Sequence, residues 1–143
     1  MRTFLKTGAP AMLILLFAYA AISKLAVLRQ FRHEMHNQNF PPEAADALTF
    51  LIPAVEITAV ILLLTEKWLR AGLVLSVILM TLFTGYIGLV LAGYWDRVPC
   101  SCGGVLRNMS WQAHFLFNLF FLALSLAAVA LPYKGKAENL RKE

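Results

Sequence analysis

Charged residues are scarce in this chain. Only 15% of its 143 residues are Asp, Glu, Lys or Arg, whereas 59% are hydrophobic. Average soluble domains carry about 25% charged residues, and a soluble domain of this size could not cover so much apolar surface with so few of them. The shortage therefore excludes an ordinary soluble domain and favours a chain that is embedded in a lipid bilayer.

Cysteine is equally scarce, because Cys100 and Cys102 are the only two in the sequence. Two cysteines argue against a structural zinc site, which would need two further ligands. Internal repeats and low-complexity segments are not evident either. The helical runs described next leave no stretch for a separate soluble domain, so residues 1–143 are predicted to form a single domain.

Long apolar runs are abundant. A membrane-spanning helix needs roughly 20 apolar residues, and four segments reach this length, at about residues 9–28, 48–64, 71–93 and 111–131. We therefore expect an all-α membrane protein, an up-down-up-down bundle of four transmembrane helices followed by a basic tail at residues 132–143. The first run is longer than the apolar core of a usual signal peptide, so it is assigned to the bundle.

Basic residues divide unequally between the two sides of such a bundle. The side with both termini has eight of them, Arg2, Lys6, Lys67, Arg70, Lys134, Lys136, Arg141 and Lys142, and the other side has five, Lys24, Arg29, Arg32, Arg97 and Arg107. The positive-inside rule therefore predicts cytoplasmic termini and a cysteine segment in the periplasm, outside a bacterial inner membrane. The net charge of +5 is then explained by contact with anionic lipid, and nucleic acid is not expected as a partner.

Several polar residues interrupt the apolar runs. Glu56 lies near the middle of the second run, where an acidic side chain costs about 2.5–3.5 kcal/mol. It should face the bundle interior, either protonated or paired, and serve in packing or in a proton relay or head-group contact. Lys24 is predicted to extend to the membrane interface, with a charge pair inside the bundle as the alternative. His114 and Asn118 are one helical turn apart and should both face inward.

The segment 29–37 mixes charged and apolar residues. This composition predicts a helical turn on the bilayer surface, which Pro41 and Pro42 would end. His33 and His36 are three residues apart and are a weak candidate for a metal site, because exposed histidines in polar loops are usually solvated.

Cys100 and Cys102 are separated by one residue. Their sulfurs can bond only if the backbone bends until the Cα atoms are within about 6.8 Å. A loop this small adds little stability, and strained bridges belong to the exchanging class of disulfides. With His114 as a candidate proton acceptor, the pair suits thiol–disulfide exchange. An inert local bridge and a soft-metal site for copper, with Met109 or His114, remain alternatives.

Five sequence blocks carry a family resemblance. They are Ser23-Lys24-Leu25, Pro53-Ala54-Val55-Glu56, Phe83-Thr84-Gly85-Tyr86-Ile87, Pro99-Cys100-Ser101-Cys102-Gly103-Gly104-Val105-Leu106, and Ser110-Trp111 with His114 and Asn118. Through them the chain resembles the MauE/DoxX group of small membrane proteins, in the branch of the methylamine utilisation protein MauE, over all but its tail. The resemblance implies a redox-associated bundle that helps form or maintain disulfides in exported proteins.

The architecture also resembles quinone-linked disulfide formers related to vitamin K epoxide reductase and to the DsbB type. Those proteins carry two cysteine pairs, whereas this chain has one. We therefore expect either a thioredoxin-like periplasmic partner that supplies the missing thiols or an accessory role for this chain. An enzyme of this kind would be a thiol–disulfide oxidoreductase. The alternatives are a non-enzymatic docking subunit and a copper-handling protein.

The expected site has two parts. The residues assigned to exchange are Cys100, Cys102 and His114, and those assigned to a quinone cofactor are Glu56, Asn118 and Trp111. The quinone itself would need a flat apolar pocket between helices.

Overall fold

The computed structural model describes residues 1–38, 40–94 and 110–132, and within these residues every regular element is helical. The elements are the π-helical turn η1 (Phe4–Gly8), α1 (Ala9–Ala26), α2 (Leu28–His36), α3 (Pro42–Leu64), the 3₁₀ turn η2 (Glu66–Trp68), α4 (Leu69–Leu91) and α5 (Trp111–Val129). Four helical stretches are long and apolar enough to cross a membrane, Phe4–Ala26, Pro42–Leu64, Glu66–Leu91 and Trp111–Val129. The predicted all-α class with four spans is confirmed.

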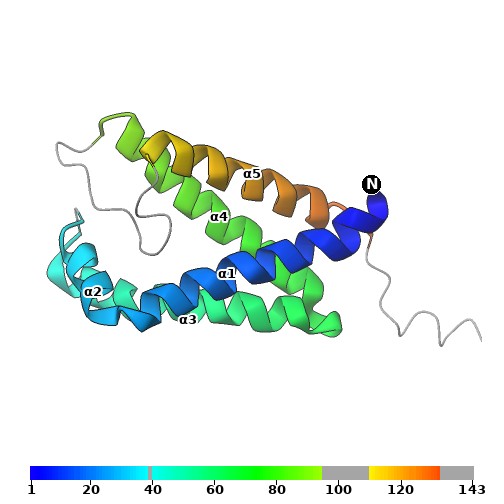
Figure 1. Cartoon of the computed structure of the whole chain (residues 1–143), viewed down its shortest axis with the longest axis horizontal. Coiled ribbons are helices and arrows are strands. Elements are labelled where there is room, and N and C mark those ends of the chain that lie inside the picture. Colours follow the sequence, from blue (N-terminus) through cyan, green and yellow to red (C-terminus); the bar gives the residue numbers. More distant parts are fainter. Residues whose placement is uncertain (39, 95–109, 133–143) are drawn as a thin grey trace, which may run out of the picture.

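The four long helices pack in the cyclic order α1, α3, α4, α5, and α5 returns to contact α1. Consecutive long helices run in opposite directions (Figure 1). The bundle has two helix pairs, α1 with α3 and α4 with α5. The two pairs lie close to each other near the N-terminus and diverge toward the end that carries α2 (Figure 1). We call this end of the bundle the α2 end. Its assignment to the periplasmic side stays a prediction.

Apolar side chains cover both the inside and the outside of the bundle. Leu13, Phe17 and Leu73 are fully or almost fully buried in the core. Leu15 and Leu116 point outward and are 71% and 66% exposed. Helices that are apolar all round are typical of membrane spans, because the hydrocarbon of the bilayer takes the place of water at the outer face.

The second span begins earlier than the predicted residue 48. α3 begins at Pro42, and proline suits the first helical position because it has no backbone N–H to leave unpaired there. Glu43 lies in the first turn, where the helix dipole favours a negative charge. Asp46 is tolerated in the second turn because it is paired with basic side chains of α2. An apolar run therefore marks the span but not the polar turn that begins its helix.

The helical turn expected at 29–37 is present as α2. The expectation that Pro41 and Pro42 end it is wrong, because α2 already ends at His36 and the two prolines begin α3. This helix buries Phe31 and Met35 against α3. On its outer side, Arg32 Nε donates to Asp46 Oδ1 over 2.8 Å, and His36 Nε2 lies 2.8 Å from the same oxygen. The hydrogen bond and charge of Asp46 raise the pKa of the Arg32 guanidinium above its ordinary value. The packing and the ion pairs together hold α2 against the first turns of α3.

α4 ends in a Schellman motif at the same end of the molecule. Gly93 adopts a left-handed backbone with φ of 72°, a conformation that glycine takes without steric cost. The Gly93 N–H donates to the Val90 carbonyl over 3.2 Å and the Tyr94 N–H to the Leu89 carbonyl over 3.1 Å. These two bonds satisfy the carbonyls of Leu89 and Val90 in the last turn of α4.

Candidate functional site

Cys100 and Cys102 lie in the segment 95–109, outside the described residues. The two described residues that flank this segment are Tyr94, after α4, and Ser110, before α5. Both helix ends lie at the α2 end of the bundle (Figure 1). The assignment of the two cysteines to exchange stays a prediction.

A buried ion pair joins α1 to α3. Lys24 Nζ lies 2.8 Å from Glu56 Oε1, and the two side chains are only 7% and 1% exposed. Lys24 faces inward because it continues the buried stripe of α1 that includes Phe17 and Ala21, at the helical spacing of three to four residues. The prediction that Lys24 extends to the membrane interface is therefore wrong, and the alternative of a charge pair is correct. Glu56 was expected to be either protonated or paired, and the structure shows it paired with Lys24.

α5 contributes two more buried polar side chains to the same region. His114 and Asn118 are 7% and 5% exposed, so both face inward, as their spacing predicted. The first turn of α5 is capped by Ser110, whose Oγ accepts from the Ala113 N–H over 3.2 Å. This cap favours the start of the helix at this position.

Trp111 lies beside this cluster. It is half-buried, and its ring stacks on His114 with 6.5 Å between ring centroids. It is absent from the described residues that line the pocket. The structure therefore places the predicted cofactor residue Trp111 next to a pocket residue and outside the pocket wall.

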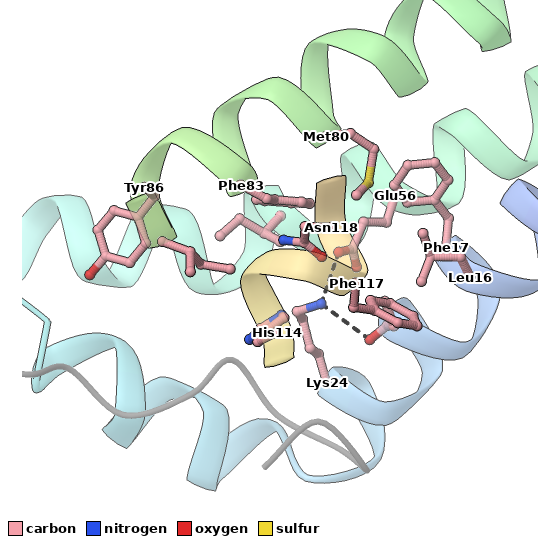
Figure 2. A pocket seen from close by; sticks show the side chains of 13 residues that line it. Leu16, Phe17, Lys24, Glu56, Met80, Phe83, Tyr86, His114, Phe117 and Asn118 are labelled. Carbon is pink, nitrogen blue, oxygen red and sulfur yellow. Dashed lines mark hydrogen bonds and ion pairs between the residues drawn. The ribbon is translucent and has the colours of Figure 1, made fainter. Parts of the chain in front are cut away.

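A pocket between the four long helices is lined by the buried polar side chains of Lys24, Glu56, His114 and Asn118 (Figure 2). The cavity volume is about 80 Å³, which is smaller than drug-sized ligand sites of about 300–1,000 Å³. The wall is mostly apolar and includes the rings of Phe17, Phe83 and Phe117. Its polar members are Lys24, Glu56, Tyr86, His114 and Asn118. Three residues of the predicted site, Glu56, His114 and Asn118, thus come together in one cavity.

Sequence reasoning missed the part played by Tyr86. Its hydroxyl is hydrogen-bonded to Gln38 Oε1, and its ring stacks on Phe40 with 5.9 Å between centroids. These contacts tie α4 to the connection between α2 and α3. In Figure 2 the Tyr86 hydroxyl points away from the Lys24–Glu56 pair, so its ring, and not its hydroxyl, faces the cluster. A tyrosine in an apolar run gives no sign of so distant a partner.

Chemically, the pocket offers a cation, a carboxylate, an amide and an imidazole inside apolar walls. Such a set can bind and orient a small polar group and can pass protons among its members. Among the described residues, no group of three or more His, Cys, Asp or Glu side chains is placed to hold a metal ion.

The family model described as "Methylamine utilisation protein MauE" matches residues 1–131 of this chain. Neither a curated protein nor a solved structure matches this chain. The DoxX part of the resemblance stays a prediction. The family match spans all four membrane-length helices and both flanks of the cysteine segment, and it follows that this multi-pass membrane protein belongs to the MauE family.

Proposed function

We propose that this chain is an accessory membrane protein of methylamine utilisation, and that Cys100 and Cys102 exchange disulfides with an exported partner protein. The family description supports the accessory role. The second part is carried by one observation: the end of α4 and the start of α5, which flank the cysteine segment, lie together at the α2 end of the bundle (Figure 1). The start of α5 also adjoins the pocket, because Trp111 stacks on the pocket residue His114.

The proposed exchange balances in atoms and electrons. A partner thiolate attacks the Cys100–Cys102 bridge, forms a mixed disulfide and displaces one cysteine of this chain as thiolate. A second partner thiolate then displaces the other cysteine. The partner gains a disulfide, and this chain gains the two electrons and, after protonation, becomes a dithiol. His114 is proposed to exchange protons with the pair, since a neutral imidazole has a ring nitrogen that can accept a proton.

The test is thiol trapping in intact cells. An alkylating reagent of known mass should modify Cys100 and Cys102 in a fraction of molecules that changes when respiration is blocked. The variant Cys100→Ser with Cys102→Ser should lower the fraction of correctly oxidised partner. The control is Ser101→Ala, which alters the same segment and keeps both thiols.

A result in which the double serine variant leaves partner oxidation unchanged would contradict the exchange. The non-enzymatic docking role would then account for the family membership. That role predicts that the double serine variant still copurifies with the partner protein.

A further inference from the structure

We propose that a groove on the outer face of α4 binds one phospholipid with an anionic head group. The groove lies at the end of the bundle opposite α2, where α3 turns back into α4 (Figure 1). The described residues that line it are different from those that line the pocket between the helices. The proposal therefore concerns a second site and does not rest on the function proposed above.

α4 supplies most of the groove, and its two neighbours complete it. The cavity volume is about 780 Å³, within the range of about 300–1,000 Å³ for small-molecule sites. Leu62 of α3 and Val129 of α5 line it together with α4 side chains that include Val74 and Ile78. Val74 and Ile78 follow Arg70 at intervals of four residues, so all three lie on one face of α4. The groove therefore runs along the helix, from Arg70 in the first turn toward the interior of the membrane span.

The groove is apolar apart from Arg70. Val74 and Ile78 are each 50% exposed, and they belong to a helical stretch that is long and apolar enough to cross a membrane. Side chains on the outer face of such a helix meet lipid hydrocarbon. A polar group would lose its hydration in the groove without gaining a hydrogen bond. The part of a ligand that fits here is therefore a hydrocarbon chain.

Arg70 lies where such a chain would meet its head group. It is exposed, and none of the ion pairs within the described residues involves it or Glu66, four residues earlier. A guanidinium presents its N–H donors in a planar fork that matches the oxygens of a phosphate. This fork has no carboxylate partner in the described part of the chain and lies at one end of an apolar groove. It therefore indicates a ligand that joins a phosphate to a hydrocarbon chain, which is a phospholipid.

The η2 turn before α4 carries a second cation and an aromatic ring. Lys67 Nζ lies 5.5 Å from the centroid of the Trp68 ring, and Trp68 is 51% exposed. Tryptophans at the ends of spans lie at the level of the lipid head groups, and basic residues there attract anionic lipid. The head group is therefore placed at Lys67 and Arg70. From there an acyl chain extends along α4 to Ile78, about 12 Å further into the membrane at the rise of an α-helix.

Charge selects among phospholipids. The η2 turn and the start of α4 carry two cations, Lys67 and Arg70, and one carboxylate, Glu66. A phosphatidylglycerol head group has a net negative charge and neutralises the excess. A phosphatidylcholine head group brings its own cation, which Lys67 and Arg70 repel. We therefore expect phosphatidylglycerol to bind more tightly than phosphatidylcholine.

The test is native mass spectrometry of the purified full chain in detergent micelles. Dioleoylphosphatidylglycerol and dioleoylphosphatidylcholine, which have the same acyl chains, are titrated separately, and the intensity of each lipid adduct gives a dissociation constant. We expect one saturable adduct of dioleoylphosphatidylglycerol. Its dissociation constant should be roughly tenfold lower than that of the phosphatidylcholine adduct, because two cations contribute to the difference.

Two pairs of variants separate the contribution of charge from that of the groove. Arg70→Gln should weaken binding of dioleoylphosphatidylglycerol by roughly fivefold or more, whereas Arg29→Gln, which removes an exposed cation at the α2 end, should leave it within about twofold. Val74→Phe fills the groove and should also weaken binding. Its control is Leu82→Phe, which adds the same ring to α4 at a 63% exposed position outside the groove lining.

Helical circular dichroism identifies any variant that does not fold. Arg70→Gln changes only an exposed side chain, and it decides if Val74→Phe does not fold.

The inference is overturned if the two lipids bind equally, if Arg70→Gln binds like the parent or like Arg29→Gln, or if folded Val74→Phe binds like Leu82→Phe. A dimer that forms without a lipid adduct and dissociates in Arg70→Gln would also overturn it, because a second copy would then occupy the groove. None of these outcomes depends on Cys100 or Cys102, so failure here and failure of the proposed disulfide exchange are distinguishable.

Discussion

At the scale of single residues, the buried Lys24–Glu56 pair is a feature whose charges are costly to place inside the bundle. Each ion alone would be expensive among apolar side chains, and the pair is tolerated because the two charges are 2.8 Å apart. Replacement of one partner leaves the other uncompensated, which is far worse than the loss of an exposed pair.

Lys24→Met is therefore expected to lower the free energy of unfolding by about 3–5 kcal/mol, because it leaves the Glu56 carboxylate buried without a counter-ion. The measurement is reversible unfolding in mixed micelles. Asp46→Asn serves as the comparison. Asp46 lies on α3, the helix that also carries Glu56, but its side chain is 43% exposed. The loss of this carboxylate should therefore lower the free energy of unfolding much less. Equal effects of the two variants would show that burial of the pair does not matter.

The double variant Lys24→Met with Glu56→Met should be more stable than either single variant. Well-packed apolar groups often replace a buried ion pair without loss of stability, because neither charge then has to be desolvated. A double-mutant cycle from the same unfolding data gives the coupling energy. Additive effects of the two substitutions would contradict the direct pairing.

At the scale of helices, one glycine sets the approach of α3 and α4. A Cβ on Gly72 would lie 2.8 Å from the backbone nitrogen of Leu63 and 3.0 Å from the carbonyl carbon of Leu62. Backbone atoms cannot move aside as a flexible side chain can. The hairpin of α3 and α4, and with it the side of the pocket that α4 forms, requires glycine at this position.

Gly72→Ala should therefore lower the free energy of unfolding by about 1–3 kcal/mol, the usual cost of overpacking. Gly85→Ala is the matched control in the same helix. A Cβ there meets nothing within 4 Å, and alanine is the better helix former by about 1 kcal/mol, so this variant should be neutral or more stable. Thermal unfolding of both variants in one detergent tests the contrast. Similar losses for both would refute it.

The start of α5 depends on its cap. Ser110→Ala removes the acceptor of the Ala113 N–H and should cost about 1 kcal/mol. Ser110→Asp keeps an acceptor at the cap and should retain most of the stability. Amide hydrogen exchange over the first turn of α5 checks both variants. Faster exchange in Ser110→Ala alone is expected, and equal exchange would mean that packing, not the cap, holds this turn.

At the scale of the whole molecule, the unequal distribution of basic residues predicts the orientation in the membrane. In a Cys100→Ser, Cys102→Ser background, a cysteine at Arg29 should react with a membrane-impermeant maleimide in intact cells. A cysteine at Lys67 should react only after the membrane is opened. The reverse pattern would place the native cysteines in the cytoplasm and would contradict the proposed exchange with an exported partner.

The four spans and the inward direction of His114 and Asn118 were predictable because they are local properties. Hydrophobic length within one segment decides whether a helix can cross a bilayer. Spacing of three to four residues decides which side chains share a face. Both follow from consecutive residues and need no knowledge of neighbouring helices. The polar first turns of α3 were not predictable in this way. Their helix is stabilised by a contact from another element, because basic side chains of α2 pair with Asp46.

The Lys24–Glu56 pair and the contact of Tyr86 with Gln38 belong to the folded bundle. Their partners are 32 and 48 residues apart. Whether they meet depends on the rotation and relative height of α1, α3 and α4, which packing of the whole bundle determines. The sequence alone determined that Lys24 and Glu56 lie in apolar runs, but it did not determine their partners. Only the packing of α1 against α3 brought them together as a neutral pair at the edge of an apolar pocket.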